Sequence, residues 1–122
     1  MSANTERWSQ DKTLYEAPVL EGAVGNVMTI TKAMTHLIQK TGPYPGIKVG
    51  QEVVFRVRNY GGPSGSSGEI FVEDISRDIQ WRMPKNFFLN STAVDISFTV
   101  LDGDQLVGQS AVNQYVIEHE SK

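Results

Sequence analysis

The chain has 122 residues, a net charge of -3 and no cysteine. This length fits a single domain that can bury a core without a metal or a disulfide, and the lack of cysteine excludes thiol chemistry and thiolate metal sites. The acidic balance argues against a nucleic-acid partner, and no run approaches the ~20 apolar residues that insertion into a membrane as a helix requires.

Residues 1–15 are predicted to form a disordered tail, because they are polar and offer little to bury except Trp8. They contain no basic segment followed by an apolar run, so no secretory signal is predicted. The protein is therefore expected in the cytoplasm or outside the cell by a non-classical export route; a module cut from a longer chain is the third possibility. The folded domain is expected over residues 16–119, with residues 120–122 as its C-terminal end.

Strand-like alternation of apolar and polar residues begins after this tail. Short strands are expected at residues 27–31 and 35–40, although residues 31–40 could instead form a short amphipathic helical turn. The clearest strand covers residues 52–60, where alternate residues point to opposite faces. Val54, Arg56 and Arg58 share the face that is expected to be exposed.

Four further strands are expected, at residues 69–73, 77–83, 93–101 and 105–117; Gly108 predicts a bend or bulge in the last. Alternation predicts a core that consists of Val53, Phe55, Val57, Ile79, Trp81, Val94, Ile96, Phe98 and Val100. The prolines of residues 42–46 predict a loop, and Asp102-Gly103-Asp104 predicts a tight hairpin. Residues 61–68, rich in glycine and serine, are expected to be a flexible loop. Short strands with this spacing, about seven in all, are typical of an all-β, immunoglobulin-type Greek-key sandwich.

Several segments carry a resemblance to a known family. The run from Tyr44 to Val53, with Gly46 and Gly50, resembles the segment that opens a strand in bacterial immunoglobulin-like domains, which are repeated in large surface and adhesin-like proteins. The segment Ile79-Gln80-Trp81-Arg82-Met83-Pro84, the alternation from Val94 to Val100, and Ser110 with Tyr115-Val116-Ile117 match later strands in the same order. Gln51 stands where aspartate is usual, and Arg56 and Arg58 stand where tryptophan and glycine often occur. The resemblance implies the fold and a non-catalytic role, and it supplies no active-site residues.

The side chains that carry chemistry are few. His36 and His119 have no partner at a metal-ligand spacing, so we expect no metal, no cofactor and no enzyme activity. Asp95, Asp102 and Asp104 could bind Ca²⁺ weakly, but solvated turn residues are the favoured interpretation. Five basic residues suggest a basic face, although acidic residues interleaved with them favour a mixed surface: Arg56, Arg58, Arg77, Arg82 and Lys85.

The candidate ligand contacts lie in or beside the two predicted loops and are Tyr44, Tyr60, Ser64, Ser66 and Ser67. Loops carry recognition in a sandwich, and exposed aromatic side chains favour interfaces. The sequence therefore predicts a binding or structural module that recognises a protein or a glycan through loops or an edge strand. The alternative is a small accessory component of a phage tail or a secretion assembly, and a hydrolase ranks last.

Overall fold

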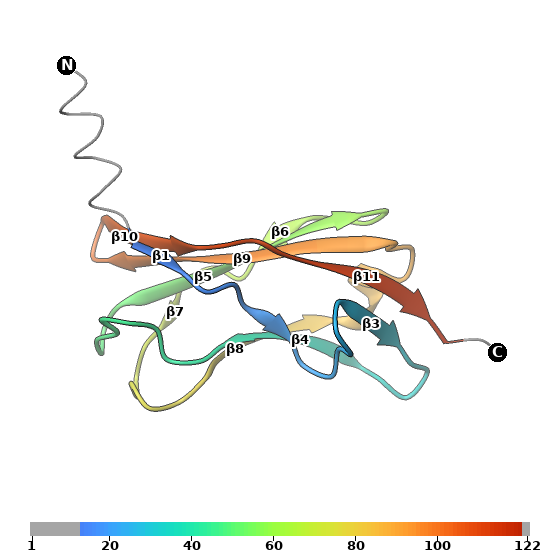
Figure 1. The fold of residues 1–122 in the computed structure, drawn as a ribbon, viewed down its shortest axis with the longest axis horizontal. Helices are drawn as coiled ribbons and strands as arrows, with labels where there is room; N and C mark the ends of the chain where they lie inside the picture. Colours follow the sequence, from blue (N-terminus) through green and yellow to red (C-terminus); the bar gives the residue numbers. More distant parts are fainter. Residues whose placement is uncertain (1–12, 121–122) are drawn as a thin grey trace, which may run out of the picture.

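The computed structural model describes residues 13–120, and this part of the chain is all-β. Its eleven strands form two sheets that pack against each other, and a short 3-10 helix, η1 (Lys85–Phe88), precedes β9 (Figure 1). The number of strands exceeds the predicted seven because several are very short and because the long run over residues 105–117 is divided into two.

The larger sheet is centred on β5 (Glu52–Tyr60) and β9 (Ala93–Asp102), which pair antiparallel from Glu52 opposite Leu101 to Tyr60 opposite Ala93. The other side of β9 pairs first with β11 (Asn113–His119) and then with β10 (Gln105–Ser110). Outside these, β1 (Thr13–Tyr15) runs parallel to β10, and β3 (Val27–Ile30) runs parallel to β11. The short strands β6 (Gly65–Ser66) and β7 (Ile70–Phe71) pair with the free edge of β5.

The smaller sheet has the order β2 (Val19–Leu20), β4 (His36–Thr41) and β8 (Ile79–Pro84), with antiparallel pairing throughout. The chain thus passes from one sheet to the other repeatedly. Residues 36–41 form a strand, so the helical alternative for residues 31–40 is wrong.

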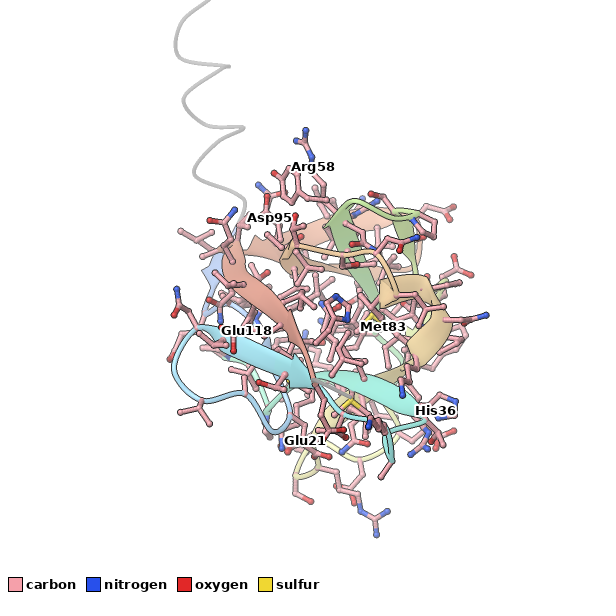
Figure 2. The ribbon with its side chains drawn as sticks, turned by 90° about the vertical axis from the view of Figure 1, so that its right-hand side faces the viewer. Glu21, His36, Arg58, Met83, Asp95 and Glu118 are labelled. Carbon is pink, nitrogen blue, oxygen red and sulfur yellow. The ribbon has the colours of Figure 1, made fainter. Side chains whose placement is uncertain are left out.

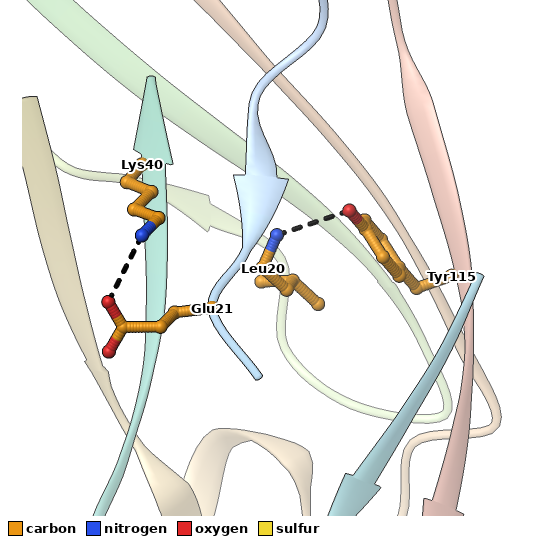
Figure 3. A network of polar contacts seen from close by, with 4 residues as sticks. All are labelled: Leu20, Glu21, Lys40 and Tyr115. Carbon is orange, nitrogen blue, oxygen red and sulfur yellow. Dashed lines mark hydrogen bonds and ion pairs between the residues drawn. The ribbon is translucent and has the colours of Figure 1, made fainter. Parts of the chain in front are cut away.

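Two hydrogen bonds, together called the polar clasp, hold the N-terminal segment where it leaves β1 in the large sheet and enters β2 in the small one. The Leu20 N–H donates to the Tyr115 hydroxyl at 3.2 Å (Figure 3), and the Asn113 side chain donates to the Pro18 carbonyl at 3.0 Å. Beside it, Lys40 pairs with Glu21 at 3.3 Å. Because Asn113 and Tyr115 belong to β11, the clasp ties the two sheets together.

The predicted tail is wrong for its last residues. Thr13–Tyr15 form β1, and Tyr15 is buried in the core, so the folded region extends beyond the predicted start at residue 16. Trp8 and the rest of residues 1–12 lie outside the described residues. At the other end, the Glu120 carboxylate accepts a hydrogen bond from the Lys32 N–H at 2.6 Å.

The core lies between the two sheets, and the alternation in β5 and β9 predicts it correctly. Their inward residues are all at most 3% exposed: Val53, Phe55, Val57, Val94, Ile96, Phe98 and Val100. Ile79 is also buried, whereas Trp81 is only partly buried and packs against both halves of the core. Burial of these side chains supplies the main stabilising free energy of the fold.

The predicted hairpin before β10 and the predicted bulge within β10 are both present. The hairpin between β9 and β10 has Gly103 at φ +63°, the first central position, where glycine is favoured in a type II′ turn. A register shift between Leu106 and Gly108 is the bulge that Gly108 predicts.

Candidate functional site

An open groove of about 590 Å³ lies on the outer face of the large sheet. The alternation that buries Phe55 and Val57 turns Arg56 and Arg58 outward, onto this face. The groove crosses three strands and the turn between β10 and β11, and its side chains come from Arg56, Arg58, Ser64, Ser66, Asp95, Ser97 and Val112.

Asp95 lies directly opposite Arg58 in the β5–β9 register, yet its carboxylate is occupied by neutral donors. The Tyr60 hydroxyl donates to Oδ2 at 2.8 Å, and the Gln114 amide donates to Oδ1 at 2.9 Å. The hydrogen bond to Asp95 is the main cause that raises the pKa of Tyr60, because it favours the protonated phenol that donates it. Arg58 lies over the Tyr60 ring instead, 5.3 Å from its centroid, and Figure 2 shows Arg58 at the outer surface, pointing away from the sandwich.

The two groove arginines form no ion pair with any described residue. The ion pairs within residues 13–120 are Lys40–Glu21 and Arg77–Asp74. Arg56 lies opposite Ser97 on one side and Ser66 on the other, neither of which carries a charge. Both guanidinium groups therefore keep their donors available to a ligand.

Three of the predicted contact residues border or line this groove. Tyr60 lies at its edge through its contacts with Arg58 and Asp95, and Ser64 and Ser66 line it. Ser64 Oγ also accepts a hydrogen bond from the Asn59 N–H at 2.9 Å. Ser67 is instead held by the backbone, because its Oγ accepts from the Phe55 N–H at 2.9 Å and donates to the Gly68 carbonyl at 2.6 Å.

Tyr44 is a core residue, which removes it from the candidate contacts. Its side chain is 5% exposed, its ring packs against Tyr15 and Phe98, and its hydroxyl donates to Gln51 Oε1 at 2.7 Å. Burial raises the pKa of Tyr44 to about 12. The Tyr44 carbonyl accepts a hydrogen bond from the Ile47 N–H at 3.1 Å, which closes a turn over Pro45 and Gly46, and the ring packs in the core.

The predicted flexible loop over residues 61–68 is instead packed onto its neighbours. Gly61 and Gly62 lie against the carbonyls of Asn90 and Phe87, and Gly65–Ser66 form β6. The serine hydroxyls then fasten this segment to the β5 backbone. The segment therefore forms one wall of the groove and is hydrogen-bonded to β5.

The sequence prediction missed Asp95, Ser97, Gln114 and Val112 as members of the site. The alternation in β9 already places Asp95 and Ser97 outside the core, which is the signal that could have indicated them. Their neighbours on β5 follow only from the register of the two strands, which the sequence alone does not provide.

The other candidate sites are dispersed. Asp95 lies opposite Arg58 in the β5–β9 pairing, whereas Asp102 and Asp104 lie at the hairpin at the far end of β9. The described residues contain no group of three side chains that could hold a metal ion. His36 and His119 contact Thr35 Oγ1 and the Ser91 carbonyl, respectively. The five basic residues do not form one face, because Arg82 belongs to β8 and Lys85 donates to the Thr31 carbonyl.

A second charged feature lies at the end of the large sheet where β5 begins. Partial desolvation, followed by the charge of Glu69 and a hydrogen bond with it, raises the pKa of Glu52, and Asp102 and Asp104 act in the same direction. The unfolded chain, in which the usual pKa applies, therefore loses this proton at a lower pH than the folded domain does. The free energy of unfolding should consequently fall as the pH rises from the unfolded pKa to the folded pKa, and it should remain lower at neutral pH.

The substitution Glu52→Gln should remove this effect. We expect it to raise the melting temperature at pH 7 and to leave it nearly unchanged at pH 3, where Glu52 is protonated in both states. Glu118→Gln, on the exposed side of β11, is the control and should show no such pH-dependent gain. A melting curve for Glu52→Gln that shifts equally at both pH values would show that the charge of Glu52 is not the cause.

Among the described residues, no helix is long and apolar enough to cross a membrane. Comparisons of the chain with protein-family models, with curated proteins and with solved structures found no match.

Proposed function

We propose that the chain is a non-catalytic, immunoglobulin-like binding module that holds its partner in the groove on the outer face of the large sheet. The fold part of this proposal is supported by the strand order. A small sheet of β2, β4 and β8 faces a larger one centred on β5 and β9, and the chain changes sheets at every connection from β1 to β5, then again between β7 and β8 and between β8 and β9. Such alternating connections are typical of immunoglobulin-like sandwiches.

The binding part is supported above all by the groove itself. Its volume of about 590 Å³ lies within the range of ligand sites, and its polar side chains converge from three strands. Asp95, Tyr60 and Arg58 are fixed by contacts with one another, so little ordering is needed when a ligand binds. Such pre-arrangement on rigid strands is what a binding site requires.

The chemistry of the groove favours binding over catalysis. A general base or an activated nucleophile needs a partner within hydrogen-bond reach and a free reactive atom. Asp95, the carboxylate of the groove, accepts hydrogen bonds at both oxygens, and Ser64 and Ser66 have no histidine among their contacts in the described structure. The proposed role is therefore recognition, with the segment of residues 61–68 as a wall of the site.

Filling the groove tests this proposal. Ser66→Trp should place an indole in the groove without touching the core, because Ser66 is exposed on β6. The purified protein and the variant would be applied to a glycan array and to a peptide array. We expect wild-type binding to a restricted set of ligands, and loss of that binding in Ser66→Trp at an unchanged melting temperature.

The matched control is Thr29→Trp, which adds the same side chain to an exposed position of β3 in the same sheet. This variant should bind as the wild type does. Equal binding by wild type and Ser66→Trp would place the binding surface outside the groove and contradict the proposal.

A further inference from the structure

We infer that the ligand of this groove is an acidic, extended segment of a partner protein, held by Arg56 and Arg58. This inference rests on the proposed binding function and adds the chemical class of the ligand. It is carried by what the groove offers: two guanidinium groups without a carboxylate partner among the described residues, and hydroxyls beside them.

The available polar side chains of the groove can all donate hydrogen bonds. Ser64 Oγ accepts from Asn59, so its own hydrogen remains for a ligand, and the hydroxyls of Ser66 and Ser97 make no hydrogen bond to a described residue. Arg56 and Arg58 add guanidinium donors. The one acidic side chain, Asp95, already accepts from Tyr60 and Gln114. The serine hydroxyls can also accept, but the guanidinium groups can only donate, so a ligand that pairs with both arginines is rich in acceptors.

The charge of the groove also favours an acceptor-rich, anionic ligand. Two arginines and one aspartate give the groove a charge of +1 (2 − 1), whereas the chain as a whole carries -3. Arg58 forms no ion pair with Asp95: the carboxylate accepts hydrogen bonds from Tyr60 and Gln114, and the guanidinium lies over the Tyr60 ring. The site is therefore a local cationic patch on an acidic protein, and it attracts anionic groups. Arginine suits carboxylates, which it can bind with two parallel hydrogen bonds.

The spacing of the two arginines favours a peptide as the carrier of these carboxylates. Arg56 and Arg58 are alternate residues of one straight strand, so their Cα atoms lie about 7 Å apart. An extended peptide repeats its own side chains at the same interval on each face. Acidic residues at alternate positions would therefore meet both guanidinium groups together. Val112, which is 63% exposed at the groove wall, offers an apolar contact to the aliphatic part of such side chains.

The test uses synthetic probes and the whole chain. The first probe is a short acetylated and amidated serine peptide with glutamate at alternate positions. The second carries the same number of glutamates at every third position, the third replaces glutamate by glutamine, and the fourth is a linear polyuronic acid. We expect calorimetric titration to show the tightest binding for the first probe, weaker binding at higher ionic strength, and no binding of the glutamine peptide.

Arg56→Gln and Arg58→Gln should each weaken binding of the alternating peptide about fivefold to tenfold. Arg82→Gln is the matched control, because Arg82 is also exposed on a strand but belongs to the small sheet, and it should bind normally. Melting temperatures close to that of the wild type would show that all three variants are folded.

The outcomes separate this inference from the proposed function. Equal affinity for the alternating and every-third peptides, or binding of the polyuronic acid in place of the peptide, would overturn the inferred ligand class. No binding of any acidic probe would overturn it as well. In each case the loss of array ligands in Ser66→Trp would still support a binding groove, whereas retained array binding in that variant would contradict the proposed function itself.

Discussion

Replacement of Phe98 by alanine should lower the free energy of unfolding by about 3–5 kcal/mol. Phe98 is fully buried on β9, and its ring lies 5.9 Å from Tyr15, 6.0 Å from Phe55 and 6.2 Å from Tyr44, measured between ring centroids. These partners come from β1, from β5 and from the segment before β5. Alanine would leave a cavity that rigid aromatic neighbours on three segments cannot fill. Urea unfolding followed by tryptophan fluorescence measures the loss.

The neighbouring residue Thr99 provides the control, since it lies on the same strand but faces outward and is only partly buried. Thr99→Ala should cost much less than Phe98→Ala. Similar losses at the two positions would mean that the inner and outer faces of β9 are wrongly assigned. The faces of β5, which form the groove, would then be wrongly assigned as well.

The second large effect is expected at Gly61, where alanine should destabilise the domain by about 2 kcal/mol or more. Gly61 has φ +95°, which a side chain makes unfavourable. A Cβ would also collide with the Asn90 carbonyl oxygen, which belongs to the segment between η1 and β9. The backbone must therefore shift at Gly61 or at Asn90. Both residues are close in sequence to the buried hydrogen bond between Asn59 and Ser91. Thermal and urea unfolding would both show the loss.

Gly65→Ala is the control within the same segment. A Cβ at Gly65 meets no atom within 4 Å, and its φ is not positive, so the free energy of unfolding should change by less than about 1 kcal/mol. If Gly61→Ala were as harmless as Gly65→Ala, the segment would be the flexible loop that its composition suggests.

The sequence is most informative where burial follows strand alternation. From Val53 to Val57 in β5 and from Val94 to Val100 in β9 every second side chain is apolar, and a one-residue error in register would expose the whole set, so the pattern predicts both the strands and their inner faces. The same argument weakens for β1, β2 and β6, because two or three residues are too few to show a period. These strands are recognised only by their hydrogen bonds to neighbouring strands, which the sequence alone does not reveal.

Composition is misleading at residues 61–68. Glycine and serine are typical of flexible linkers, but here two glycines permit close approach to the η1 segment. Two serine hydroxyls replace strand partners for the Asn59 and Phe55 N–H groups. Which acceptor a hydroxyl meets depends on tertiary contacts. The same holds for Tyr44, whose burial depends on Gln51 and on the ring of Phe98.

The candidate site was predictable in part. The outward direction of Arg56 and Arg58 follows from alternation, and Ser64 and Ser66 belong to a predicted loop, the kind of segment that carries recognition in a sandwich. The role of Asp95 does not, because it depends on a register that places Asp95 opposite Arg58 and on Gln114, a residue of β11. A groove formed by several strands therefore becomes visible only when the sheet order is known.

The parallel pairing of β1 with β10 and of β3 with β11 gives the domain a particular response to tension. The described chain begins at β1 and ends after β11, at opposite ends of the molecule (Figure 1). A force that pulls these ends apart draws β1 toward its start and β11 toward its finish, along the strand axes. Parallel neighbours then slide past each other, so their hydrogen bonds bear the load together and do not open one by one. The two strand pairs at the margin of the large sheet thus strengthen the sandwich against stretching.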